Sequence, residues 1–161
     1  MVGLVISDTF LLTGNWQDDA DGSLTVSDVT QVQFTEPITS FLHNEAELNA
    51  ILASTLRKAK EVNSFAGQDI VIGLPDSFVE HSIVKMEHDL SRDDHEEYIK
   101  WLDIQKSRSK DQSVYIFGQV YYPAEENIHV CTVPRALVRT LKLSITEMGG
   151  NARWMGPVSS M

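Results

Sequence analysis

Cysteine is almost absent from this sequence, with Cys131 the single one among 161 residues. One thiol cannot form an internal disulfide, which fits a protein of a reducing compartment. No stretch reaches the roughly 18 consecutive apolar residues that a membrane-spanning helix needs. The N-terminus has no basic segment followed by an apolar stretch and a small-residue cleavage site, so nothing indicates export. These absences predict a cytoplasmic protein.

Basic residues are also few, since 13 Lys and Arg stand against 23 Asp and Glu, for a net charge of -10. Phosphate contacts supply most of the affinity in nucleic-acid binding, so this balance argues against a nucleic-acid partner. The one basic stretch, "KSRSK" at 106–110, is interpreted as a solvated loop. The length and the 42% hydrophobic content allow one well-formed core, with room only for a small inserted subdomain beside it.

The N-terminal residues predict three strands joined by short turns. Residues 2–7 and 10–16 form apolar runs, and residues 24–34 alternate apolar and polar side chains. Ser7-Asp8-Thr9 would form the first turn, because Ser and Asp side chains bond their own backbone. The second turn, "QDDADGS" at 17–23, contains the Asp-Gly pair that is typical of hairpins. The expected product is a three-stranded meander.

Helix signals frame the middle and the end of the chain. Asn44 with Glu47 three residues later matches a capping box, and apolar residues at helical spacing follow. Residues 69–75 predict a central buried strand. Pro134 and Gly149-Gly150 predict the start and end of another helix, after which the last stretch forms a strand. The expected buried faces are Leu48, Ile51, Leu52, Leu56, Ala59 and Val62 in the first helix, and Leu137, Val138, Leu141, Ile145 and Met148 in the last.

Residues between these segments predict a smaller unit. Residues 78–86 would be a strand, and Ser91 would begin a helix that runs to about residue 105 with acidic residues in its first turns. Residues 113–123 and 127–134 would form a hairpin.

Three passages in this order resemble the N-terminal half of actin-like proteins, in particular the PilM-like family of type IV pilus assembly proteins. They are "GLVISDTFL", "DIVIGLPDSFVEHSIVKMEHDLSRDDHEEYIKW" and "IHVCTVPRALVRTLKLSITEMGGNARWMGPVSSM". The resemblance implies an α/β fold with a mixed sheet, the actin-like or ribonuclease H-like half. Residues 1–75 and 134–161 would form the first subdomain, and residues 76–133 a small inserted α+β subdomain of the PilM/FtsA type.

The resemblance also locates a degenerate phosphate loop. The family places an acidic residue two positions after a leading glycine and a second glycine two positions further on. Gly3 matches the leading glycine, but Val5 and Ser7 stand at the other two positions. The carboxylate that would orient Mg²⁺ is absent, as is the glycine that lets the backbone approach a phosphate. Asp8 follows without a matching role, so we expect no cofactor, no metal and no enzymatic activity.

The function that the resemblance implies is that of an assembly scaffold. Its partner would be the short cytoplasmic tail of an inner-membrane protein, held along the inserted subdomain as an added strand or in a groove. The protein would then lie at the inner membrane through this partner, without inserting into the membrane. The formation of homo-oligomers is left as a further possibility. The two strands carry more apolar residues than so small a sheet can bury on both faces, which favours an exposed patch for a partner. Alternatively, the helix predicted for 91–105 covers one face and the other is only partly exposed. The predicted partner-binding residues are Phe78, Val79, Ile83, Tyr115, Phe117 and Tyr121.

Two other functions stay open at this point. One is an ATP-binding actin-like protein whose second lobe lies outside this chain. The other is a metal-dependent enzyme that uses the His and acidic residues of 88–97, although the H-E-x-x-H spacing of zinc sites is missing. The short polar phrases "DDADG" at 18–22 and "GLPDS" at 73–77 are interpreted as turns.

Overall fold

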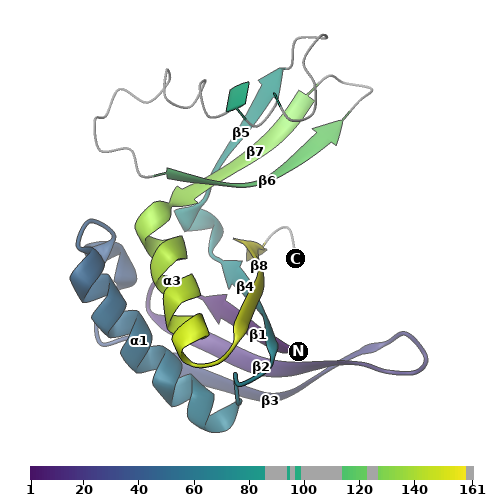
Figure 1. Cartoon of the computed structure of the whole chain (residues 1–161), viewed down its shortest axis with the longest axis vertical. Helices are drawn as coiled ribbons and strands as arrows, with labels where there is room; N and C mark the ends of the chain where they lie inside the picture. Colours follow the sequence, from purple (N-terminus) through teal and green to yellow (C-terminus); the bar gives the residue numbers. More distant parts are fainter. Residues whose placement is uncertain (86–93, 95–96, 99–113, 123–126, 159–161) are drawn as a thin grey trace.

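The computed structural model describes residues 1–85, 94, 97–98, 114–122 and 127–158. The strands form a five-stranded sheet of order β3-β2-β1-β4-β8 and a three-stranded sheet of order β5-β7-β6 (Figure 1). In chain order the elements are β1 (Val2–Ile6), β2 (Phe10–Asp18), β3 (Leu24–Gln33), the 3-10 helix η1 (Ile38–Phe41), α1 (Glu45–Val62), β4 (Asp69–Leu74), the 3-10 helix η2 (Asp76–Phe78), β5 (Glu80–Lys85), β6 (Val114–Tyr122), β7 (Asn127–Pro134), α3 (Arg135–Glu147) and β8 (Asn151–Pro157).

The N-terminal meander is confirmed, because β2 pairs antiparallel with both β1 and β3. The first turn closes where the Ser7 amide donates to the Phe10 carbonyl at 2.8 Å. The second closes where the Gly22 amide donates to the Asp19 carbonyl at 2.9 Å, with Gly22 at a φ of 80° that favours glycine. The β2–β3 hairpin extends well beyond the rest of the five-stranded sheet (Figure 1).

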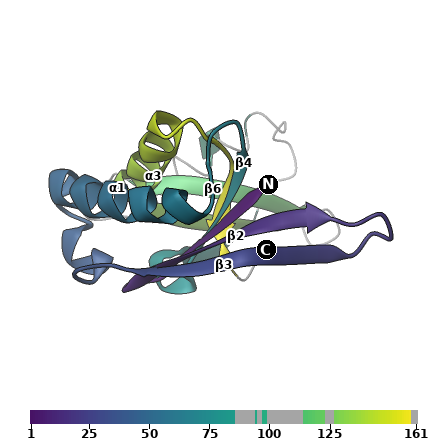
Figure 2. The same ribbon diagram turned by 90° about the horizontal axis from the view of Figure 1, so that it is seen from below.

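The rest of this sheet is parallel. β4 lies between β1 and β8 and runs parallel to both, which confirms its predicted central position. Figure 2 shows α1 and α3 on the same side of the sheet. The fold is therefore the predicted mixed α/β type.

The core lies between this side of the sheet and the two helices. Asn44 caps α1 as predicted, since its side-chain oxygen accepts from the Glu47 amide at 3.4 Å. From there each turn of α1 contributes an apolar side chain to the core. The residues with 0% exposure are Leu4, Leu11, Ile38, Leu48, Leu52, Leu56, Ala59, Phe65, Ile70, Ile72, Leu74, Leu137, Leu141 and Ile145.

The end of the chain also follows the sequence signals. Pro134 precedes α3, and Gly149 ends it with a φ of 84°. At Gly150 an added Cβ would lie 3.0 Å from Ile145 Cγ2, so a larger residue would require its neighbours to shift where β8 starts beside the helix. The predicted hairpin of β6 and β7 is confirmed by their antiparallel pairing.

Some local expectations are wrong. Val62, the last residue of α1, is 53% exposed, whereas Thr55 of the same helix is buried. The segment between β3 and α1, for which no element was predicted, contains η1. β5 begins at Glu80 rather than at residue 78, because a turn of 3-10 helix precedes it. The helix predicted for 91–105 lies largely outside the described residues, and the division into subdomains stays a prediction.

Candidate functional site

Gly3, the leading residue of the degenerate phosphate loop, lies within β1 under the ring of Trp16. A Cβ added to Gly3 would stand 2.6 Å from Trp16 Nε1. This glycine therefore permits the close approach of a tryptophan ring from the neighbouring strand. Val5, two residues further on, is half-buried and lies in register with Leu12 and Gly73.

Asp8 and Ser7 are engaged in the turn that follows β1. The two carboxylate oxygens of Asp8 accept from the Thr39 amide at 2.9 Å and from the Thr39 hydroxyl at 3.2 Å. The Asp8 carbonyl accepts from the Ile38 amide at 2.9 Å, so Asp8 fixes η1 to the turn. The Ser7 amide, as described above, donates to Phe10. The interpretation of Ser7-Asp8-Thr9 as a hairpin turn is confirmed, and the role of Asp8 in holding η1 was not predicted.

The predicted partner-binding residues do not form one exposed patch. Phe78 and Val79 are 6% and 7% exposed and belong to the hydrophobic core. Their expected exposure is wrong, because the Phe78 amide bonds the Pro75 carbonyl at 2.9 Å and this turn of η2 directs both residues inward. Ile83, by contrast, is 71% exposed on β5.

The remaining three predicted residues lie on the far strand of the same sheet. Tyr115, Phe117 and Tyr121 belong to β6, and β7 separates β6 from β5. In backbone register Phe117 pairs with Cys131 and Tyr121 with Ile128, while Ile83 pairs with His129. Within the described residues, β5 pairs with β7 and with no second strand.

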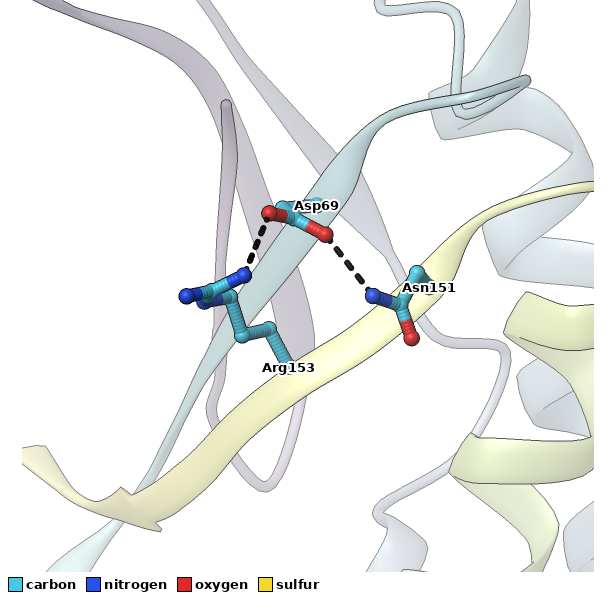
Figure 3. Close-up of polar contacts among 3 residues, drawn as sticks. All are labelled: Asp69, Asn151 and Arg153. Carbon is cyan, nitrogen blue, oxygen red and sulfur yellow. Dashed lines mark hydrogen bonds and ion pairs between the residues drawn. The ribbon is translucent and has the colours of Figure 1, made fainter.

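A polar cluster that was not predicted joins β8 to β4 (Figure 3). Asp69 accepts from Asn151 Nδ2 at 2.8 Å and from Arg153 Nη1 at 3.1 Å. The register shifts between Ile70 and Val71, where β8 has one extra residue, and this bulge brings Arg153 to Asp69. The Asp69 and Arg153 side chains are 41% and 68% exposed, so the cluster fixes the edge strand without forming an enclosed site.

The other candidate sites have ordinary structural explanations where they are described. Residues 73–77 end β4 and enter η2, as the turn interpretation predicted. At residues 18–22 the Ser23 amide donates to Asp21 Oδ1 at 2.9 Å, and hydrogen bonds from Ser23 lower the pKa of Asp21. In the part of the chain that the structure describes, no group of His, Cys and acidic residues could hold a metal. Most of the 88–97 segment lies outside that part.

The arrangement of the two sheets is similar to that of known structures. Neither protein-family models nor curated proteins match the sequence. Among solved structures, the PilM-PilN type IV pilus biogenesis complex matches with a TM-score of 0.68 and 13% identity, over 97% of this chain and 46% of that chain. The cytoplasmic domain of EpsL, an inner membrane component of the type II secretion system of Vibrio cholerae, matches with a TM-score of 0.59 and 12% identity, over 97% and 56%. This chain has a PilM-like fold.

The PilM-like fold confirms the resemblance that the sequence motifs indicated. At 13% and 12% identity the likeness concerns the fold, and the chain spans about half the length of the structures it matches. No helix within the described ranges is long and apolar enough to cross a membrane.

Proposed function

We propose that this chain is a non-catalytic assembly module that binds a short peptide tail of an inner-membrane protein in a pilus or secretion system. The PilM-like fold supports this, because one matched structure is the PilM-PilN complex and the other belongs to an inner membrane secretion component. The protein would act in the cytoplasm, at the inner membrane through its partner.

The edge of β5 opposite β7 carries the proposal, since it has no partner strand among the described residues. An edge strand presents unpaired backbone donors and acceptors to a further strand. A tail that adds in this way gains main-chain hydrogen bonds, and its side chains gain contacts at alternate positions. Ile83, 71% exposed in the middle of β5, supplies an apolar contact, and the exposed Glu80 and Lys85 at the two ends of the strand supply charges that fix the direction of the tail.

The geometry of the β1–β2 turn supports the non-catalytic part of the proposal. Phosphate loops surround an anion with free backbone amides and a glycine that permits close approach. Here Trp16 covers Gly3, the Ser7 amide bonds Phe10, and Asp8 bonds Thr39. The groups that would bind a phosphate are thus bonded or covered within the protein. ATP binding is therefore the weaker alternative.

Calorimetry with synthetic tail peptides tests the proposal. The peptides would come from the cytoplasmic ends of inner-membrane proteins encoded beside this gene. We expect one of them to bind, and Ile83→Asp to weaken its binding by at least about tenfold, since a charge replaces the exposed apolar contact. Leu143→Asp is the matched control, because Leu143 is a 52% exposed aliphatic residue on α3.

Phe78 is unsuitable for this test, because its replacement would damage the core. If no tail binds, or if both Asp variants lose binding equally, the β5 proposal fails. Heat of binding with Mg-ATP in the same instrument would instead support the nucleotide-binding alternative.

A further inference from the structure

Lys and Arg are missing from one whole part of the molecule. The first 56 residues contain eight Asp and Glu and neither Lys nor Arg, so all 13 basic residues lie from Arg57 onward. These 56 residues form β1, β2, β3, η1 and most of α1. Apart from the Met1 ammonium, which donates to the Trp16 carbonyl at 3.4 Å, the surface of the β2–β3 hairpin is therefore acidic or uncharged.

The same hairpin exposes a strip of aliphatic side chains. Leu24, Val26 and Val29, all on β3, are 51%, 46% and 63% exposed, and we call them the β3 strip. Val26 pairs with Trp16, and an added Cβ at Gly14 would lie 3.3 Å from Val26 Cγ1 and 3.4 Å from Val29 Cγ2. Leu24 is two residues before Val26 on the same strand, so the three side chains share one face.

The strip lies on a strand with an open edge. β3 is the outermost strand of the five-stranded sheet and, within the described residues, pairs only with β2. Proteins usually protect such edges with Lys, Pro or a bulge. Residues 24–33 contain no Lys and no Pro. Two of these three protections are therefore absent from β3.

One protective feature is present, at Asp28. Its φ is 52°, which interrupts the strand, and its carboxylate accepts from Asn15 Nδ2 at 3.0 Å. The Asp28 carbonyl accepts from Asn63 Nδ2 at 3.0 Å, which ties this point of β3 to the end of α1. Leu24–Ser27 lies between this point and the hairpin turn and, among the described residues, pairs with β2 and no second strand.

We propose that the Leu24–Ser27 edge and the β3 strip bind an extended partner segment in which apolar residues alternate with Lys or Arg. The apolar side chains would cover the strip, and the basic ones would face Asp19 and Asp21 at the tip and Asp28 at the other end. A second copy of the chain is a poor occupant, because two β3 strands would bring acidic surfaces together without a compensating base. This surface is separate from β5 and does not depend on the function proposed above.

Nuclear magnetic resonance with two synthetic probes tests the proposal. One peptide alternates Val with Lys and the other alternates Val with Glu. We expect the Val-Lys peptide to shift the backbone amides of residues 24–29, and this binding to weaken as salt is raised. The Val-Glu peptide should leave these amides unchanged.

Variants locate the contact. Val26→Asp and, as a second choice at the more exposed tip, Leu24→Asp should each weaken binding of the Val-Lys peptide by at least about tenfold, while Leu143→Asp should not. The proposal is overturned if residues 24–29 do not shift, if both peptides bind equally, or if Leu143→Asp has the same effect. Sedimentation that shows a dimer dissociated by Val26→Asp would also overturn it, because a second copy would then occupy the edge.

Discussion

The two faces of the five-stranded sheet are built differently. Toward the helices, Leu4, Ile70 and Ile72 fill the space with branched aliphatic side chains that are fully buried. On the opposite face the same strands carry glycines, Gly3 in β1, Gly73 in β4 and Gly156 in β8, the last covered by its own strand's Trp154 as Gly3 is by Trp16.

The two faces of the sheet cover the backbone of their strands in different ways. A Cβ added to Gly156 would lie 2.6 Å from Trp154 Cζ2, so this ring, like that of Trp16, takes the place of a missing side chain. Such aromatic covering of strand glycines preserves contact area where no second layer packs. In the described residues, α1 and α3 supply a second layer on one face only. The helix face should therefore hold most of the packing energy.

Ile72→Ala removes a buried side chain from the helix face and should have the largest effect on stability. It creates a cavity under the helices and should lower the free energy of unfolding by about 2–5 kcal/mol. Chemical denaturation measures this change. Val71→Ala is the neighbouring control, since half-buried Val71 lies on the opposite face, and a loss as large as that of Ile72→Ala would contradict the comparison.

Gly3→Ala tests the glycine face. The new Cβ must displace the Trp16 ring, at a cost of about 1–3 kcal/mol. In a background with Trp101→Phe and Trp154→Phe, fluorescence emission from Trp16 should shift to the red as the ring moves into water. Combining Gly3→Ala with Trp16→Ala should cost less than the sum of the two single changes. Strict additivity would show that the ring and the glycine are not coupled.

Arg153→Gln tests how much the exposed polar cluster at the sheet edge contributes to stability. The ion pair with Asp69 is exposed, so its loss should cost less than about 1 kcal/mol, and less still in high salt. Asp69→Ala should cost more, because Asn151 then also loses its acceptor. Thermal unfolding at low and high salt measures both, and an equal effect of the two variants would count against a shared cluster.

Asp21, at the hairpin tip away from both faces, should show the smallest effect. Hydrogen bonds from Ser23 lower its pKa in the folded chain. This contribution to stability is complete above the unfolded pKa and is lost as the pH falls through the lower, folded pKa. Carbon-13 titration of the carboxyl group should show the lowered pKa, and Ser23→Ala should bring it back toward the usual value. An unchanged pKa in that variant would exclude the Ser23 hydroxyl as the cause and leave the backbone amide of residue 23.

The parts of this fold that depend on neighbouring residues could be predicted from the sequence. Asn44 and Glu47 specify the start of α1, and Gly149 specifies the end of α3, because caps act within one turn. The Asp19–Ser23 turn follows from its Asp-Gly pair in the same way. The order of these local elements carried the resemblance that the PilM-like fold confirmed.

Features that depend on distant residues could not be predicted. Asp8 meets Thr39 across 31 positions, and no local pattern connects them. Phe78 and Val79 were predicted to lie exposed on a strand. They are buried because the η2 turn, which no local pattern indicated, directs them into the core. Gly3 fits both a phosphate loop and a tryptophan contact, and the ring of Trp16 had to be placed before the two could be distinguished.

The contact between Asp69 and Asn151 has a consequence for how the chain folds. It joins residues 82 positions apart, whereas β1, β2 and β3 pair through short turns. Loop closure becomes more costly with length, so contacts between distant residues tend to form slowly. We therefore expect the meander to assemble first and β8 to dock last. The cost rises by only about 0.6 kcal/mol for each doubling of the loop, so the region between β4 and α3 can change length with little effect on the stability of the sheet.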